Sequence, residues 1–268
     1  MQKSDKMAII IYSCEKNKDM WNYFSILFKK YWKDCPYQVI LVTDRFEGKE
    51  MGSYQLTESE YVFDKVVVDD NTWSHMLKSA IKAAGTPFVS LWMDDYLLCD
   101  YIENQVIEEK IALTEKYHAG NLRLVESPMI PSEMYKDDPN TGFYKPGTAY
   151  SICTQVGIWN TEYLEKYMKD GWSAWDFERL GSIEIKDEEY PLLATLDYTF
   201  PYEEGVRRGM WMDNGVRLCK RNGIKLDFKK RPAMSNWELC KIYFKGAVLE
   251  WNPTLVVKIQ NFLSRRKK

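Results

Sequence analysis

The sequence predicts an α/β fold in which a mainly parallel β-sheet is flanked by helices. Three observations favour this class. Short apolar runs rich in Ile and Val recur through the first hundred residues. Segments with apolar residues at helical spacing separate these runs, and each run ends in polar or acidic residues. Such alternation is typical of a doubly wound sheet, whose ligands bind at the carboxyl ends of the strands.

The first half of the chain gives the expected strands and helices in order. The run Met7–Tyr12 predicts a buried strand that leads into the polar loop Ser13–Asp19. Apolar residues at helical spacing predict a helix over Trp21–Trp32. The elements expected next are strands at Tyr37–Thr43 and Tyr61–Val68, a helix over about Thr72–Ala84 that ends at Gly85, and a strand from Val89.

The second half is less regular. Pro, Asn, Asp and Gly crowd Pro128–Gly147, which predicts a long loop of the kind that can cover a cleft. Farther on, Trp175 and Glu178 would share one face of a helix that starts near Gly171, whereas Asp176 would point elsewhere. The other elements expected here are a helix over Asp100–Tyr117, strands at Leu122–Glu126 and Ser151–Trp159, and a helix over Thr161–Met168.

Composition describes a globular protein and limits its partners. The 268 residues fit one domain, and 45% hydrophobic with 28% charged residues is typical of a soluble chain. A net charge of −2 gives no electrostatic reason to expect nucleic acid as a partner. The six cysteines form no CxxC pair and stand beside no export signal, so we expect reduced thiols and a cytoplasmic location.

Two adjacent carboxylates, Asp94 and Asp95, end the apolar run that starts at Val89. Moving isolated carboxylates out of water is costly, so we expect the pair at the mouth of the strand. There it could hold a hard divalent cation that bridges two phosphates. A strand that ends in a solvated turn is the alternative. Neither a GxGxxG nor a GxxxxGK[ST] motif occurs, so the sequence supports neither a dinucleotide fold of the usual type nor a P-loop.

The order and spacing of five stretches resemble the GT-A fold of nucleotide-sugar-dependent glycosyltransferases, in particular bacterial enzymes of capsule and lipopolysaccharide assembly. The resemblance implies a nucleotide-sugar-binding half over 7–100 and an acceptor-binding half over 101–250, in a single domain with a tail at 251–268. The five stretches are Ser13–Asp19, Trp73 through its helix to Met93-Asp-Asp-Tyr96, Gln155-Val-Gly-Ile-Trp159, Trp175-Asp-Phe-Glu178 and Glu204–Trp211.

The resemblance assigns a donor site. Asp94 and Asp95 would occupy the DxD position, where Mn²⁺ or Mg²⁺ and the donor phosphates bind. Tyr96 replaces the usual third acid, and neither histidine of the chain lies in the late position where many relatives add a metal ligand, so metal dependence stays open. Cationic side chains could offset the charge of the diphosphate instead. The remaining donor-binding residues expected are Ser13, Asp19, Asp44, Trp73, Arg207 and Arg208.

The resemblance also assigns an acceptor site and a reaction. Glu178 would be the general base of an inverting transfer, with Asp176 behind it. Gln155, Trp159 and Trp175 would shape the acceptor pocket, although a core position is an equal alternative for Trp159. The expected reaction moves a sugar from a UDP-sugar or similar donor to a hydroxyl of a saccharide or lipid-linked saccharide in surface polysaccharide assembly. A degenerate binding or scaffold protein and a sugar nucleotidyltransferase are the alternatives.

The C-terminal tail carries a separate pattern. Apolar residues from Leu255 to Leu263 fall on one helical stripe, and the basic run Arg265–Lys268 follows. An amphipathic helix with a basic end can lie on an anionic membrane surface, here the cytoplasmic face of the inner membrane. A final helix docked on the core, with a basic end, is the alternative.

Overall fold

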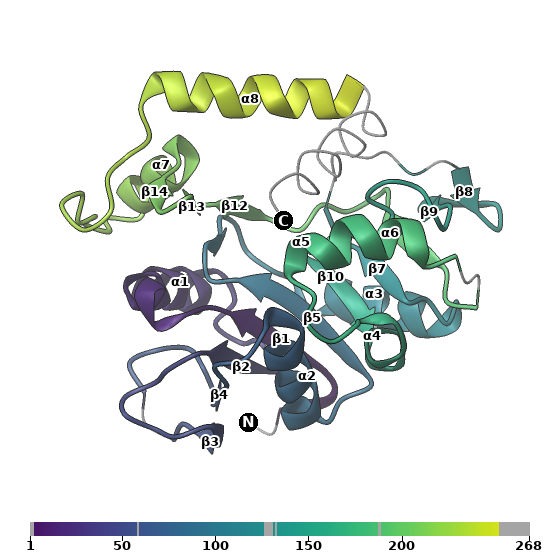
Figure 1. Ribbon diagram of the computed structural model, residues 1–268, viewed down its shortest axis with the longest axis horizontal. Helices are drawn as coiled ribbons and strands as arrows, with labels where there is room; N and C mark the ends of the chain where they lie inside the picture. The colour runs from purple at the N-terminus through teal and green to yellow at the C-terminus, as the bar shows by residue number, and fades with distance from the viewer. Residues whose placement is uncertain (1–2, 58, 126–130, 132, 187–188, 252–268) are drawn as a thin grey trace.

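The structure is a computed structural model, and it describes residues 3–57, 59–125, 131, 133–186 and 189–251. A ten-stranded sheet crosses the molecule in the order β3-β4-β2-β1-β5-β10-β7-β11-β9-β8 (Figure 1). The strands are β1 (Ser4–Tyr12), β2 (Tyr37–Thr43), β3 (Gly52–Gln55), β4 (Lys65–Val68), β5 (Phe88–Met93), β7 (Asn121–Arg123), β8 (Glu133–Tyr135), β9 (Asp138–Tyr144), β10 (Gly157–Asn160) and β11 (Leu192–Thr195).

Strand direction confirms the mainly parallel α/β class. Strands β4, β2, β1 and β5 pair in parallel, and so do β7 and β11. Following the pairing across the sheet, β3, β10 and β9 run opposite to the other seven strands. The parallel block brings the carboxyl ends of β2, β1 and β5 to one edge of the sheet, where a ligand site is expected.

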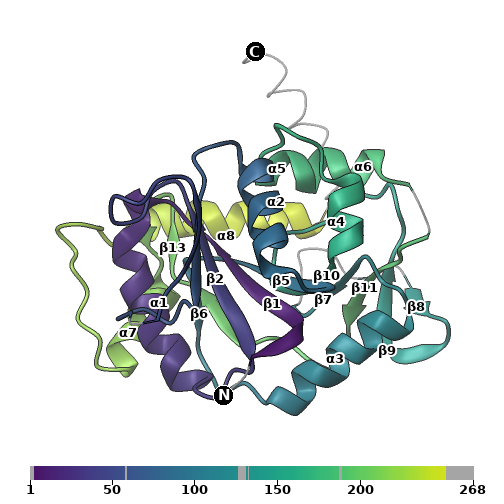
Figure 2. The same ribbon diagram turned by 90° about the horizontal axis from the view of Figure 1, so that it is seen from below.

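Helices cover both faces of the sheet (Figure 2). One face carries α1 and α3, and the other carries α2, α4 and the short helices near residue 178. Side chains alternate along β1, so Ile9 and Ile11 pack toward α1 while Ala8 and Ile10 pack toward α2. The helices are α1 (Lys18–Tyr31), α2 (Trp73–Ala84), α3 (Asn104–Lys116), α4 (Thr161–Tyr167), α5 (Ala174–Asp176), α6 (Ser182–Glu184), α7 (Asp213–Arg221) and α8 (Asn236–Trp251).

Three smaller features frame the edge where the parallel strands end. A short 3-10 helix, η1 (Glu15–Asn17), follows β1 directly. Strand β6 (Tyr96–Leu98) follows β5 after a two-residue turn and pairs with β12 (Tyr202–Glu204). A hairpin of β13 (Val206–Arg207) and β14 (Met210–Trp211) comes next along the chain.

The structure corrects several expectations. The predicted loop over 128–147 is wrong, because β8 and β9 form a hairpin there that adds to the sheet. The expected strand Tyr61–Val68 begins only at Lys65, since Tyr61 and Phe63 pack into the core without pairing. The expected strand Ser151–Trp159 is limited to β10. By contrast, α2 ends at Gly85 as predicted, where φ is 64°, a value that glycine adopts readily.

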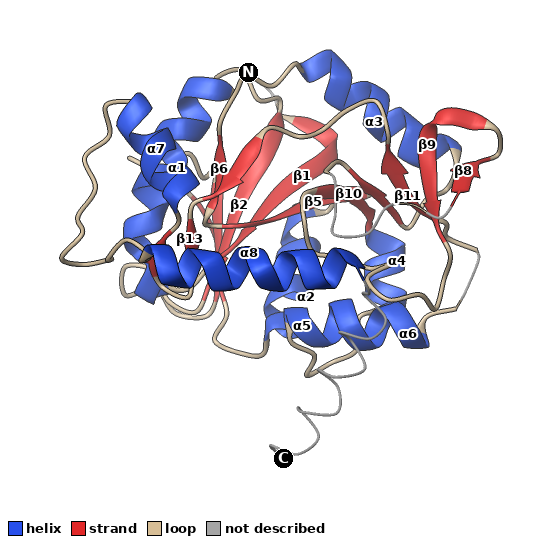
Figure 3. Cartoon of the chain, turned by 90° about the horizontal axis from the view of Figure 1, so that it is seen from above, coloured by secondary structure: helices blue, strands red, loops and turns tan. Residues whose placement is uncertain are grey.

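Helix α8 runs across the molecule beyond the edge that bears the carboxyl ends of the parallel strands (Figures 1 and 3). Its Trp237 and Phe244 side chains are exposed. The predicted stripe over 255–263 and the basic run over 265–268 lie outside the described residues. In the part of the chain that the structure describes, no helix has both the length and the apolar character needed to cross a bilayer.

Candidate functional site

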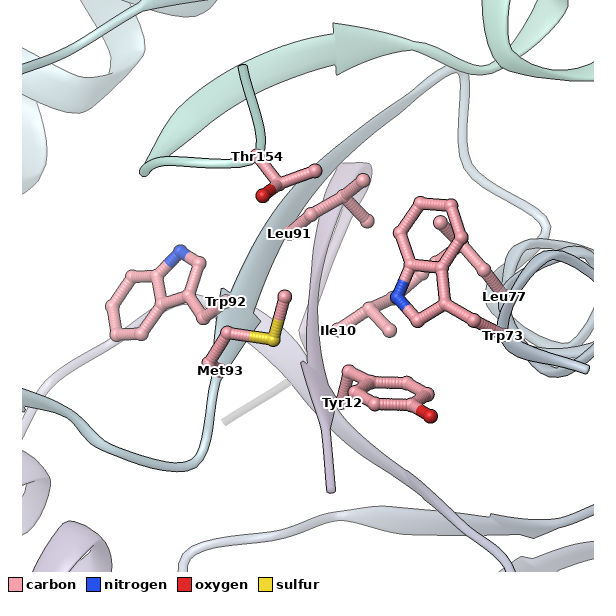
Figure 4. A pocket seen from close by; sticks show the side chains of 8 residues that line it. All are labelled: Ile10, Tyr12, Trp73, Leu77, Leu91, Trp92, Met93 and Thr154. Atoms are coloured by element: carbon pink, nitrogen blue, oxygen red, sulfur yellow. The ribbon is translucent and has the colours of Figure 1, made fainter. Parts of the chain in front are cut away.

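A small pocket lies where the parallel strands end, between β1, β5 and the start of α2 (Figure 4). Most of the apolar walls come from the α2 side of the sheet. Thr154 closes the pocket from the loop that precedes β10. Trp73 caps the other side, as the first residue of α2. The lining residues are Ile10, Tyr12, Trp73, Leu77, Leu91, Trp92, Met93 and Thr154.

Asp94 directly follows Met93, a wall of this pocket, and is buried. Its Oδ2 accepts a hydrogen bond of 2.5 Å from Ser13 Oγ at the end of β1. Ser13 Oγ in turn accepts from Trp21 Nε1 at 2.7 Å. Burial raises the pKa of Asp94 to about 6, although the hydrogen bonds from Ser13 and Asn17 oppose that shift. The turn at the end of β5 therefore holds a carboxylate whose charge is poorly compensated by the protein.

Asp95 is half-buried beside Asp94. Burial and the negative charges of Asp94 and Glu204 raise the pKa of Asp95 well above its ordinary value. Arg207 opposes this shift, but both ends of its guanidinium donate to the Glu204 carboxylate. The cation of Arg207 is thus near Asp95 but shared with a second acid. Arg208 occupies the exposed tip of the same hairpin, with a φ of 54°.

The acidic pair supplies two of the carboxylates that a divalent cation completed by a ligand would need. Among the described residues, no group of three or more His, Cys, Asp and Glu side chains is placed to hold a metal ion. Mg²⁺ is commonly bound by one or two carboxylates together with substrate phosphates and water. Asp94 and Asp95 supply such a pair, and a cation would relieve the repulsion that raises the pKa of Asp95.

An ion pair that the sequence pattern did not predict lies at this edge of the sheet. Arg231 is buried, and its Nε and Nη2 donate to the two carboxylate oxygens of Asp19 at 3.1 and 3.0 Å. Nη2 also donates to Asn17 Oδ1 at 3.2 Å. Asp19, expected to bind the donor, is therefore paired with Arg231, and Lys230 Nζ lies 3.7 Å from its Oδ1. The positive charge of Arg231 also opposes the burial-driven rise in the pKa of the neighbouring Asp94.

Asp44 and Trp73, two further expected donor residues, lie on either side of Tyr12. Asp44 Oδ1 accepts from the backbone N–H of Glu15 at 2.7 Å, which fixes the loop after β1. Burial raises the pKa of Tyr12, and the negative charge of Asp44 adds to that rise. Trp73 packs edge-to-face on Tyr12, with ring centroids 6.4 Å apart. Ser13, Asp44, Trp73 and the acidic pair thus gather at one edge.

Glu178 approaches the pocket from the opposite side. It lies in a π-helical turn, Phe177–Gly181, inserted between α5 and α6, and only 9% of it is exposed. Single π-turns inside helices occur often at functional sites. Thr154 donates to Glu178 Oε1 twice, through its backbone N–H and its hydroxyl, each at 2.7 Å. Because Thr154 also lines the pocket, Glu178 is linked to the pocket by one residue.

Asp176 has a different environment from Glu178. It forms a capping box with Ser173, whose Oγ donates to Asp176 Oδ2 at 2.7 Å. Its other oxygen is 3.7 Å from Arg179 Nη2. Trp175 is 68% exposed, so the expectation that Trp175 and Glu178 share a face is wrong. The π-helical turn changes the spacing that this expectation assumed.

The expected acceptor residues do not form one group. Trp159 is fully buried, 5.6 Å from Phe177 between ring centroids, so it belongs to the core and the expectation that it shapes an acceptor pocket is corrected. Gln155 is half-buried and accepts a hydrogen bond from Tyr202 Oη. Tyr202 packs on Tyr96, with 4.7 Å between the ring centroids. Gln155 therefore belongs to an aromatic cluster next to Thr154.

Comparisons with known proteins find solved structures that share this chain's overall shape at low sequence identity. No family model matches the chain, and no curated protein does. Residues 1–349 of S. aureus TarS in complex with UDP-GlcNAc are 15% identical, with a TM-score of 0.45 over 77% of this chain and 60% of that one. S. aureus TarS is 14% identical, with a TM-score of 0.43 over 74% of this chain and 36% of that one. The chain thus spans less than two thirds of the TarS structures.

Two further solved structures are similar to the same extent. A Drosophila β-1,4-galactosyltransferase 7 mutant in complex with manganese, UDP-Gal and xylobiose is 11% identical, with a TM-score of 0.41 over 76% of this chain and 72% of that one. A UDP-glucose pyrophosphorylase complexed with UDP-glucose is 10% identical, with a TM-score of 0.43 over 75% and 92%. At such values the function must be inferred from the site itself.

Proposed function

We propose that the chain is a GT-A-fold glycosyltransferase that moves a sugar from a nucleotide-activated donor to a hydroxyl of a saccharide or lipid-linked saccharide. The observation that carries the proposal is the pair of acidic sites beside one pocket. Asp94 and Asp95 follow the strand that forms one wall. Glu178 is held by Thr154, which forms another. Glycosyl transfer needs these two functions, a site for the diphosphate and a base for the acceptor.

The donor diphosphate would bind at the acidic pair. Asp94 and Asp95 would hold Mn²⁺ or Mg²⁺, which supplies positive charge to the leaving diphosphate when bound. Arg207 lies close enough to Asp95 to oppose the rise in its pKa that burial causes, and it could face the same phosphates. Ser13 fixes the orientation of the Asp94 carboxylate. In accord with the sequence resemblance, a UDP-sugar is the donor that we propose.

The acceptor hydroxyl would lose its proton to Glu178. Two donors from Thr154 hold Oε1, and among the described residues neither a hydrogen bond nor an ion pair engages Oε2. Oε2 can therefore take the proton while Oε1 keeps the carboxylate in place. Direct attack by the deprotonated hydroxyl on the face opposite the diphosphate would invert the anomeric centre. Asp176 takes no part in this scheme, because it caps α5.

We also propose a cytoplasmic location with peripheral contact to the inner membrane. A cytoplasmic enzyme of bacterial surface polysaccharide assembly would meet lipid-linked acceptors at the inner membrane. The exposed Trp237 and Phe244 of α8 precede the sequence stripe over 255–263 and the basic run over 265–268. Together they could bind an anionic lipid surface. Sedimentation with anionic vesicles, compared with neutral ones, tests this: equal recovery with both would refute it.

Product analysis tests the reaction class. The purified chain is incubated with a UDP-sugar panel, a mixture of oligosaccharide acceptors and Mn²⁺. We expect acceptor-dependent release of UDP. Pyrophosphate-dependent formation of UTP would instead indicate a sugar nucleotidyltransferase. Binding of a UDP-sugar without either product would indicate a degenerate binding protein. Glu178→Gln is the matched control, because it should retain donor binding and lose acceptor-dependent release.

A further inference from the structure

We infer that the pocket beside the acidic pair selects donors whose sugar carries an acetamido group, and that Trp73 is the residue that recognises the amide. The inference rests on the proposed function and names its substrate class. Its basis is an indole N–H that the fold buries without a partner at the wall of a pocket. Buried polar groups are normally hydrogen-bonded, so a ligand acceptor is the natural partner for this donor.

Packing fixes the Trp73 ring in one position. The residue is 9% exposed, and its ring packs against Tyr12 and against Phe177, with a centroid distance of 5.9 Å to the latter. Among the described residues Nε1 has no hydrogen-bond partner. Figure 4 shows this nitrogen turned toward the centre of the lining side chains. A rigid donor at an otherwise apolar wall selects for a carbonyl oxygen.

The remaining walls suit a small apolar group. Ile10, Leu77 and Leu91 are aliphatic, and Met93 is flexible and half-buried. The cavity measures about 10 Å³ as the space open to the centre of a water-sized probe, so it admits a group of about the size of a water molecule or a methyl group. A methyl group fits this space, and rotation of the unbranched Met93 side chain would open a path to the indole N–H.

Thr154 supplies the complementary acceptor. Its hydroxyl hydrogen is directed at Glu178 Oε1, so its lone pairs can accept a hydrogen bond from a ligand N–H. An acetamido group offers a carbonyl acceptor, an N–H donor and a methyl group together. A sugar hydroxyl in the same place would set a polar group against aliphatic walls. A deoxy-sugar methyl would leave the Trp73 N–H unpaired.

The placement suits the transfer reaction. Met93 immediately precedes the acidic pair, and Thr154 holds Glu178. An acetamido group in this pocket would attach to a sugar ring that lies between the diphosphate site and the base. The same contacts that recognise the amide would then orient the ring for attack.

Calorimetry with UDP, UDP-GlcNAc and UDP-glucose tests the inference, because the two sugars differ only in the acetamido group. We expect UDP-GlcNAc to bind roughly 10- to 100-fold more tightly than UDP-glucose, as expected when a buried donor gains or lacks its partner. Trp73→Phe, which keeps a ring and removes the N–H, should reduce this ratio to within about threefold, and the affinity for UDP, measured beside it, is the reference for both sugars. Trp172→Phe is the matched control, since Trp172 packs on Phe177 but does not line the pocket.

Saturation-transfer NMR on the wild-type chain gives a second measurement that needs no variant. The acetyl methyl of bound UDP-GlcNAc should receive the strongest saturation among the sugar protons. Equal affinity for UDP-GlcNAc and UDP-glucose, or a ratio that survives in Trp73→Phe, would overturn the inference while UDP binding still supported the proposed function. Absence of binding of all three ligands would overturn both.

Discussion

The acidic groups on the two sides of the pocket differ in how the protein compensates their charge. Asp94 and Asp95 are adjacent and partly or fully buried, and each has a raised pKa. Glu178 is equally buried, but the Thr154 backbone and hydroxyl both donate to it. The ionised form of the Asp94–Asp95 pair is disfavoured in the protein alone, and a bound cation would stabilise it. The second is already fixed as a hydrogen-bonded carboxylate.

This difference separates two kinds of functional acid. A pair of carboxylates whose ionisation is penalised is stabilised by a bound cation or by uptake of a proton, because either relieves the repulsion. A single carboxylate with one oxygen anchored and the other directed away from its donors can accept a proton without moving. The same residue type thus suits charge binding on one side and proton transfer on the other.

The largest expected effect is on the Glu178 side. Glu178→Gln keeps the size of the side chain but cannot accept the proton, so turnover at saturating acceptor should fall by roughly 10²- to 10⁴-fold. Donor affinity should stay the same, since Glu178 lies across the pocket from the acidic pair. Asp176→Asn, at the helix cap, is the control and should retain near-normal turnover. Steady-state rates with calorimetric donor binding check both. A larger loss in Asp176→Asn would assign the base to that residue instead.

On the donor side, the ion pair behind the acidic pair should control stability. Arg231→Met would remove the buried cation paired with Asp19 and leave that half-buried carboxylate only Lys230, at 3.7 Å. Breaking a buried pair typically costs roughly 3–5 kcal/mol of unfolding free energy, and we expect a loss near the lower end of that range because Asp19 keeps one cation. Urea unfolding measures this loss. The double variant Asp19→Asn with Arg231→Met should recover much of it, because no uncompensated charge remains. Additive losses in the double variant would show that the two side chains do not depend on each other.

The raised pKa of Asp94 predicts a pH dependence of stability. The folded value of about 6 lies above the ordinary 3.8, so the folded state binds the proton more tightly. The contribution of this bound proton to the free energy of unfolding is complete below pH 3.8, and it is lost as the pH rises to about 6. This costs roughly 2–3 kcal/mol at pH 7. Urea unfolding from pH 4 to 7 should lose this part of the slope in Asp94→Asn. An unchanged slope in that variant would contradict the account of the acidic pair.

The smallest expected effect is at the cap of α5. Asp176→Asn removes the charge from a capping box in which Ser173 and Asp176 satisfy each other's backbone donors. Loss of a cap typically costs about 1 kcal/mol. Thermal unfolding at neutral pH should show a decrease of this order. A change several times larger would mean that Asp176 supports more than the helix end, and it would weaken the contrast with Glu178.

The sequence predicted the parallel half of the fold well, because each strand there is a continuous apolar run and each helix carries a clear apolar stripe. It predicted less of the second half. The edge strand β8 and its neighbour β9 were predicted as a loop, since Pro, Asn, Asp and Gly are frequent in this segment and β9 pairs with β11, which is distant in the sequence. Local composition does not predict which strand pairs with which, as in the pairing of β9 with β11.

The site shows the same division. The strand-end residues Ser13, Asp44 and Asp94 could be found from their position after apolar runs. Arg231 could not, because it pairs with Asp19 across 212 residues and nothing near it in the sequence signals a partner. The role of Thr154 could not be predicted either, because its partner Glu178 is 24 residues away in the sequence. The π-helical turn at Glu178 was also invisible, since its extra residue shifts a face that helical spacing assigns to Trp175.

The central claim, that the acidic edge binds a nucleotide-sugar diphosphate, is tested most directly by calorimetric titration of UDP into the wild type and Asp95→Asn, each with and without Mn²⁺. The account predicts that Mn²⁺ strengthens UDP binding to the wild type, and that Asp95→Asn loses this gain without a lower Tm. Absence of UDP binding under all conditions, or equal Mn²⁺-dependent binding by Asp95→Asn, would contradict it.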